Sequence, residues 1–165
     1  MTKHISTKRL ILLPCIIAAA IALDQILKAL VIKYLPLHEP TESFLGFRLH
    51  YTRNTGAAFS LFSERPLFLA VTVGVIISVC VFYLFFDLKR PYTQSVCIAL
   101  ICAGGLGNLV DRIRLGYVID YIEPVFVRFA VFNFADMVLT CTVTVWAFLL
   151  FREIIKEQRI LSNKT

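Results

Sequence analysis

The chain has 165 residues, of which 58% are hydrophobic and 17% charged, and its formal net charge is +6. Soluble domains average roughly 45–50% apolar and about 25% charged residues, so the composition excludes an ordinary soluble domain and indicates a membrane protein. The Lys and Arg residues flank the apolar runs and form no single basic stripe with interleaved aromatic residues, which argues against nucleic-acid binding. The length suits one domain over residues 1–165.

Four apolar stretches are long enough to cross a bilayer, which takes about 20 residues. We predict transmembrane helices over about 10–32, 66–86, 94–112 and 135–151. The first also resembles a secretory signal peptide, because basic residues precede it and Ala18-Ala19-Ala20 imitates a cleavage site. However, the apolar helical pattern continues past these alanines, and Asp24 and Lys28 share a helix face where they can pair. A discarded signal peptide has no use for such a pair, so we expect a retained helix.

The stretches between these helices, 35–64 and 113–133, contain strand-like patterns. Aromatic and aliphatic residues alternate with polar ones over 47–52, and a second alternation covers 117–122. Asn54-Thr55-Gly56 predicts a turn or bend. We expect short strands packed on the membrane surface, with their aromatic rings at the interface.

The charge distribution suggests an orientation. Four crossings put both termini on one side, which carries nine of the 17 Lys and Arg residues and three of the 11 acidic residues. Positive residues favour the cytoplasmic side. We therefore predict cytoplasmic termini and outward-facing connecting stretches, although nine positive residues against eight is a small bias.

Several kinds of reactive site lack sequence support. The five cysteines lie inside apolar segments without a Cys-x-x-Cys pair, and the three histidines are scattered. We expect no disulfide framework, no metal site and no cofactor. The chain also has no Gly-x-Ser-x-Gly elbow and no His-Glu-x-x-His pair, so serine, cysteine and zinc peptidase mechanisms have little support.

Asp111 belongs to a polar segment near the end of the third predicted helix. Asn108, Asp111 and Arg112 can share a helix face because they lie three and four positions apart. The preceding glycines at 104, 105 and 107 favour close helix packing. A carboxylate beside a guanidinium is held ionised, so we expect Asp111 and Arg112 to form a local ion pair. Asp111 is then a structural anion and a poor proton shuttle.

Asp120 lies among apolar strand residues, with no basic residue within five positions. It could be a solvated loop residue. Alternatively, its apolar setting could raise its pKa and keep it neutral at working pH.

Asp136 stands at the entrance of the fourth predicted helix. Asn133 could be the N-cap, with Asp136 completing a capping box at the positive end of the helix dipole. The connecting strands could bring Asp120 and Asp136 together on the outer side. Two such carboxylates can activate a water and protonate a leaving amine. Asn54 could be a turn residue or an amide donor to a substrate carbonyl.

Five short motifs in this order resemble bacterial lipoprotein signal peptidase, also called signal peptidase II. The motifs are Asp24 with Lys28, Asn54 through Ser60, Gly104 through Arg112, Gly116 through Tyr121, and Asn133 through Asp136. Each motif alone is weak, but five of them in order between four apolar spans are highly specific.

The resemblance implies an aspartic endopeptidase of the bacterial inner membrane, without a cofactor. It would cut diacylglyceryl-modified prolipoproteins just before the lipidated cysteine, and globomycin-type antibiotics would block it. The implied fold is four transmembrane helices with a small extracytoplasmic β-cradle and a short lid helix. By carry-over Asp120 and Asp136 form the catalytic dyad. The implied supporting residues are Asn54, Gly56, Asn108, Arg112, Asn133 and Asp111, with Asp24 and Lys28 holding the first helix.

Two other functions are compatible with a small polytopic protein. A proton- or ion-coupled transporter could use Asp24, Lys28, Asp111 and Asp136 as relay groups. It predicts polar residues near the bilayer midplane, whereas the second apolar stretch has no charge and the acids cluster near one face. A non-enzymatic scaffold predicts that the aspartates can be replaced without loss.

Overall fold

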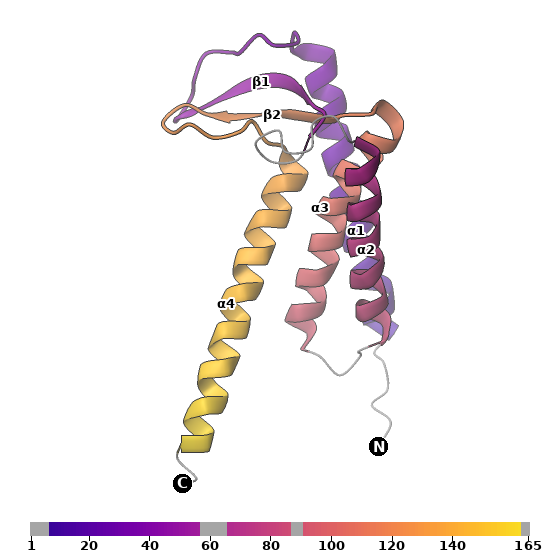
Figure 1. The fold of residues 1–165 in the computed structure, drawn as a ribbon, viewed down its shortest axis with the longest axis vertical. Helices are drawn as coiled ribbons and strands as arrows, with labels where there is room; N and C mark the ends of the chain where they lie inside the picture. The colour runs from indigo at the N-terminus through magenta and orange to yellow at the C-terminus, as the bar shows by residue number, and fades with distance from the viewer. Residues whose placement is uncertain (1–6, 57–65, 87–90, 163–165) are drawn as a thin grey trace.

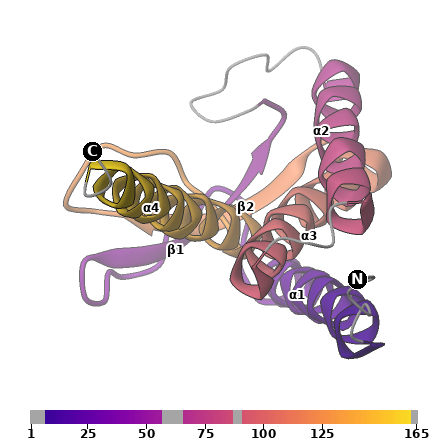
Figure 2. The same cartoon turned by 90° about the horizontal axis from the view of Figure 1, so that it is seen from below.

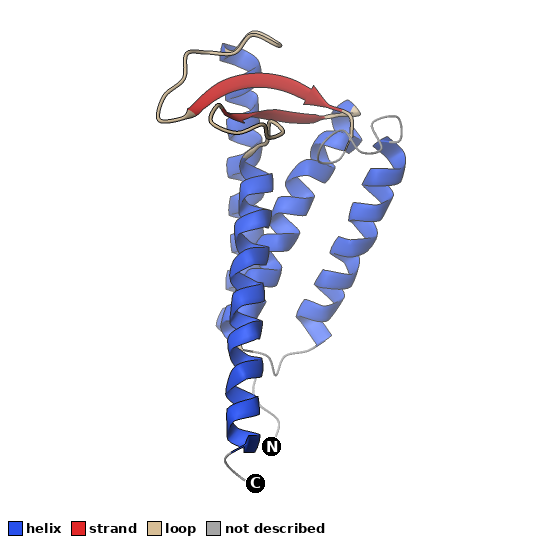
Figure 3. Ribbon diagram, turned by 60° about the vertical axis from the view of Figure 1, so that its left-hand side comes forward, coloured by secondary structure: helices blue, strands red, loops and turns tan. Residues whose placement is uncertain are grey.

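The computed structural model describes residues 7–56, 66–86 and 91–162. Its helices are α1 (Thr7–Tyr34), α2 (Pro66–Phe86), α3 (Tyr92–Leu115) and α4 (Phe134–Ser162), and its strands are β1 (Phe47–Asn54) and β2 (Val118–Pro124). The helices run along the long axis and the two strands cross one end of them (Figures 1 and 3). The predicted combination of four long helices and a small sheet is confirmed.

Each of the four helices is long and apolar enough to cross a membrane. The stretch Leu67–Leu84 of α2 has a mean hydropathy of 2.7. Large apolar side chains on the outer faces of the helices are exposed, including Leu67, Phe82 and Phe148. In water such surfaces would be costly, so these faces suit contact with lipid.

Two helix ends differ from the sequence prediction. We predicted that the third helix ends at 112, but α3 continues to Leu115, where Gly116 caps it with a left-handed φ of 80° and its N–H donates to the Arg112 carbonyl. Glycine adopts this conformation without steric cost, which makes it a common helix terminator. We predicted an end at 151 for the fourth helix, but α4 runs to Ser162. Its last residues include neither Pro nor Gly and are good helix formers, so charge alone does not end it.

Helix α3 is the centre of the bundle and packs against the other three helices. Seen from below, α3 lies between α4 on one side and α1 and α2 on the other (Figure 2). Glycine permits this close packing. A Cβ at Gly104 would lie 2.7 Å from the Ala135 carbonyl oxygen, and one at Gly107 would lie 2.7 Å from Asp24 Oδ2. The predicted packing role of the glycines is therefore confirmed.

Gly104→Ala should lower the stability of the protein because the added methyl group meets a backbone carbonyl that cannot rotate away. Overpacking of this kind costs about 1–3 kcal/mol. The matched control is Gly74→Ala in α2, where an added Cβ meets nothing within 4 Å. Thermal unfolding in detergent should show a lower midpoint for Gly104→Ala only. Equal midpoints for the two variants would contradict the close approach of α3 and α4.

The sheet is antiparallel and holds the site over the helix ends. Thr52 pairs with Asp120 and Asn54 with Val118, and the register shifts between Leu49 and Thr52. Val31 of α1 packs with Tyr51, Ile119 and Tyr121 of the two strands, which fastens the sheet to the first helix. This small sheet corresponds to the implied β-cradle.

The implied short lid helix is not found in residues 35–56 or 116–133. Residues 57–65 lie outside the described part of the chain, and with them most of the motif from Asn54 through Ser60.

Candidate active site

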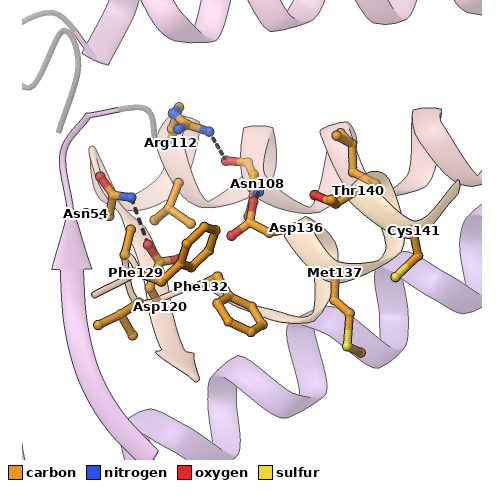
Figure 4. Close-up of a pocket in the computed structure, with 14 residues that line it drawn as sticks. Asn54, Asn108, Arg112, Asp120, Phe129, Phe132, Asp136, Met137, Thr140 and Cys141 are labelled. Carbon is orange, nitrogen blue, oxygen red and sulfur yellow. Dashed lines mark hydrogen bonds between the residues drawn. The ribbon is translucent and has the colours of Figure 1, made fainter. Parts of the chain in front are cut away.

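A cavity of about 430 Å³ lies where α3, α4 and the sheet meet (Figure 4). Five polar side chains line it on the side away from Met137 and Cys141 (Figure 4): Asn54, Asn108, Arg112, Asp120 and Asp136. The remaining wall is largely apolar and includes Phe129, Phe132, Met137, Leu139, Thr140 and Cys141. An apolar cavity with a few convergent polar groups is the usual form of a binding or catalytic site.

Asp120 is buried in β2, with 2% of its surface exposed. Its Oδ2 accepts a hydrogen bond of 2.8 Å from Asn54 Nδ2, and its Oδ1 accepts one of 2.7 Å from Asn133 Nδ2. Burial, followed by the charge of Asp136, raises the pKa of Asp120 to about 7, against the opposing effect of the two hydrogen bonds. The alternative of a solvated loop aspartate is therefore wrong.

Asp136 is the third residue of α4 and completes the predicted capping box. Its N–H donates to Asn133 Oδ1 over 3.0 Å, and its Oδ2 accepts from the Asn133 N–H over 3.2 Å. Its Oδ1 accepts from Asn108 Nδ2 over 2.7 Å. The carboxylate that caps the helix thus also lines the cavity.

Asn133 joins the two aspartates. Its Nδ2 donates to Asp120 Oδ1 and, over 3.0 Å, to Asn108 Oδ1, while its Oδ1 accepts from the Asp136 N–H. The side chain is fully buried and each of its polar atoms has a partner. These partners fix the orientation of the amide. A flipped amide would point its NH2 group at the Asp136 N–H and its oxygen at the oxygens of Asp120 and Asn108. The two aspartates are therefore brought to one cavity on either side of Asn133.

An ion cluster lies behind the cavity, between α1 and α3. Lys28 Nζ lies 2.9 Å from Asp24 Oδ2 and 2.8 Å from Asp111 Oδ2, and it donates to Asn108 Oδ1 over 3.0 Å. The predicted pair of Asp24 and Lys28 is confirmed. All three charged side chains are almost fully buried.

The predicted local ion pair of Asp111 with Arg112 is wrong. Asp111 pairs with Lys28 instead. Consecutive residues of an α-helix point about 100° apart, so Asp111 faces α1 while Arg112 faces the cavity. Arg112 Nη2 donates to the Gly56 carbonyl over 3.0 Å, and its Nη1 donates to the Asn108 carbonyl over 3.5 Å.

Asn54 forms the predicted turn, and its amide donates to Asp120, while its role as a donor to a substrate carbonyl stays a prediction. Its Oδ1 accepts from the Gly56 N–H over 2.9 Å, which closes the turn, while its Nδ2 donates to Asp120. Both backbone polar groups of Gly56 are hydrogen-bonded, because its N–H donates to Asn54 and its carbonyl accepts from Arg112.

Gln25, for which no role was predicted, also belongs to the ion cluster between α1 and α3. Its Nε2 lies 2.9 Å from Asp111 Oδ1, 3.2 Å from Asp24 Oδ2 and 3.2 Å from the Gly107 carbonyl. A signal was available, because Gln25 and Lys28 are three positions apart on one helix face. A polar residue there, inside an apolar span, indicates a polar partner on a neighbouring helix.

Comparison with known protein families accounts for this arrangement. The model of the family Signal peptidase (SPase) II matches residues 16–152. The chain belongs to the signal peptidase II family. This match includes all five motifs on which the resemblance rests, and it supports a peptidase over a transporter or a scaffold.

Relatives and solved structures agree with membership of the signal peptidase II family. A lipoprotein signal peptidase of Streptococcus agalactiae serotype V is 38% identical over 147 residues, covering 88% of this chain and 95% of its own. One of Enterococcus faecalis is 39% identical over 135 residues, covering 81% and 83%. A bacterial membrane enzyme solved at 2.3 Å resolution superposes with a TM-score of 0.80 at 27% identity, covering 86% of this chain and 88% of its own. Together with the four apolar helices, this makes the chain a multi-pass membrane protein.

Proposed function

We propose that this signal peptidase II removes signal peptides from diacylglyceryl-modified prolipoproteins, with Asp120 and Asp136 as its catalytic pair. The observation that carries the proposal is that both aspartates line one cavity and are bridged by the buried side chain of Asn133, which donates to the Asp120 carboxyl group and accepts from the Asp136 N–H. Paired carboxylates in different environments can divide the roles of acid and base between them.

The division of roles follows from the surroundings of each carboxyl group. Asp120 has its pKa raised to about 7 by burial and by the charge of Asp136, so it can stay protonated and donate a hydrogen bond to the scissile carbonyl. Asp136 accepts two N–H hydrogen bonds and faces the cavity. As an ionised base it takes a proton from the attacking water, and this proton then goes to the leaving amine. No metal or covalent intermediate is needed.

The lipid on the substrate explains why the peptidase is a membrane protein. A soluble enzyme would have to extract acyl chains at about 0.8 kcal/mol per methylene. In this chain the polar end of the cavity lies at the ends of apolar helices, and the rest of its wall is largely apolar. A lipidated cysteine anchored in the bilayer could therefore place the preceding peptide bond beside the aspartates. We infer that globomycin-type antibiotics would occupy the same cavity.

We further infer that the protein lies in the inner membrane of a bacterium with cytoplasmic termini and its cavity near the outer face. The segment that follows β2 supports a contact between this end of the protein and lipid. It turns back on the helix side of the strands (Figure 1), and it exposes 71% of Phe126, 50% of Val127 and 53% of Phe129. Aromatic side chains beside an arginine, here Arg128, suit the interfacial region of a bilayer.

Cleavage of a diacylated prolipoprotein by the purified protein tests this function. A gel shift should appear with the diacylated substrate and should be absent when the same precursor is supplied without the lipid. Equal cleavage of both precursors would contradict the lipid requirement, and cleavage of neither would contradict the function.

The rate of cleavage should fall as the pH rises through about 7, the value to which the pKa of Asp120 is raised. The acid role needs the protonated carboxyl group, which is present below this pKa and lost above it. A kcat profile between about pH 5 and 9 measures the fall. Thermal unfolding over the same range would separate titration from loss of the fold. A rate that stays constant or increases up to pH 8.5 would contradict the assignment of Asp120 as the acid.

A further inference from the structure

The buried ion cluster is connected to the main chain beside each aspartate of the proposed pair. Asp111 Oδ2 accepts a hydrogen bond of 3.2 Å from the N–H of Ile119, the residue before Asp120. Asp24 Oδ1 accepts one of 3.2 Å from the N–H of Ala135, the residue before Asp136. The two anions thus hold equivalent points of β2 and α4, and Lys28 holds both anions.

We propose that Asp24, Lys28 and Asp111 form a positioning clamp that sets the separation of Asp120 and Asp136. The inference rests on the proposed function of these two aspartates. The three clamp residues do not line the cavity, so they act through the groups that they contact and are positioning residues.

The bonding of the clamp leaves it little freedom to rearrange. Lys28 has three N–H donors and three acceptors, namely Asp24, Asp111 and Asn108. Every carboxylate oxygen of the two clamp anions also has a donor, since Gln25 Nε2 lies within hydrogen-bond distance of Asp24 Oδ2 and Asp111 Oδ1. A fully satisfied buried network favours one geometry. Buried ion pairs add little net stability compared with apolar packing, so a role in geometry explains this cluster better than a role in stability.

Lys28 also reaches Asp136 by a second route. It donates to Asn108 Oδ1, so the other end of that amide, Nδ2, must point away and donate to Asp136 Oδ1. The clamp therefore orients Asp136 through its backbone neighbour and through a side chain. Misplacement of a reacting group by about 1 Å can cost about 10²-fold in rate.

Gln25→Leu tests the clamp without changing the charge of the site. The substitution removes the neutral donor that links Asp24 to Asp111 and leaves Lys28 in place. We expect kcat to fall about tenfold with KM within about twofold, because chemistry suffers and substrate binding does not. Asp111→Asn keeps the acceptor for Ile119 but loses the ion pair with Lys28, and we expect a decrease in kcat of about 10–100-fold.

The pH profile of Gln25→Leu separates positioning from simple loss of structure. If the aspartates move apart, the charge of Asp136 raises the pKa of Asp120 less, and the alkaline fall in kcat shifts to lower pH. The charged and titratable groups around Asp120 are Asp136, Lys28, Arg112 and Tyr121, together with Asp111, which accepts from the N–H of the preceding residue. Gln25→Leu removes a neutral hydrogen bond to Asp111 but adds or removes no charged group, so a shift reports a change in the distance between Asp120 and Asp136.

The matched control is Gln94→Leu, which removes a hydrogen bond of 2.9 Å between Gln94 of α3 and Glu153 of α4 at the other end of the helices. It should leave kcat, KM and the pH profile unchanged. A wild-type kcat and pH profile for Gln25→Leu, while Asp120→Asn is inactive, would overturn the clamp and keep the catalytic pair. A lower thermal midpoint with an unmoved pH profile would also overturn it. Full activity of Asp120→Asn would overturn the pair and the clamp together.

Discussion

Asp120→Asn and Asp136→Asn should each reduce the cleavage of a diacylated prolipoprotein by at least about 10³-fold, within the range lost when a general acid or base is removed. Asn keeps the shape of each side chain, and its carbonyl oxygen can still accept one of the existing hydrogen bonds. It cannot take or deliver a proton at the reacting bond. A gel-shift assay with purified variants measures the loss, and thermal unfolding shows whether each variant retains the fold.

Replacing both aspartates should reduce the activity no further than replacing one of them. A residue pair that exchanges one proton is strongly non-additive, so the double variant should be no less active than either single variant. Full activity in either single variant would contradict the pair. Retention of activity in both, with complete loss in Asp111→Asn, would mean that Asp111 is the catalytic aspartate.

Much of the fold is predictable because the bilayer restricts the solutions. A chain that crosses lipid must satisfy its backbone within each span, so apolar length alone predicts helices. The end of α3 could not be predicted from apolar length, because it depends on the backbone conformation of one residue. Gly116 is visible in the sequence, but only its left-handed φ shows that the helix continues to Leu115.

The site divides into predictable and unpredictable contacts in the same way. The capping box of Asn133 and Asp136 is local, and its spacing predicts both hydrogen bonds. The partner of Asp111 depends on how α1 packs against α3, which glycines at the interface permit but do not specify. Neighbouring charges in a sequence are therefore weak evidence of an ion pair, as Arg112 illustrates by facing the cavity.

Lys28→Met should destabilise the protein by about 3–5 kcal/mol, the usual cost of removing one partner from a buried ion pair. Met has nearly the same length, so the loss comes from charge. Asp24 and Asp111 would remain buried, with Gln25 and two backbone N–H groups as donors and no cation between them. Thermal unfolding in detergent would show a lower midpoint for this variant.

Two further variants identify the cause of this loss. Lys33→Met makes the same substitution five residues later in α1, where the side chain is exposed and its ammonium lies over the ring of Tyr34, so its stability should change by at most about 0.5 kcal/mol. Combining Lys28→Met with Asp24→Asn and Asp111→Asn removes all three buried charges and should recover most of the lost stability, since uncharged groups can share the remaining donors. If the clamp determines geometry, this stable triple variant should still cleave slowly. Recovery of both stability and kcat would contradict this role of the clamp. It would show that the three charges contribute to folding only and that the surrounding amides position the aspartates.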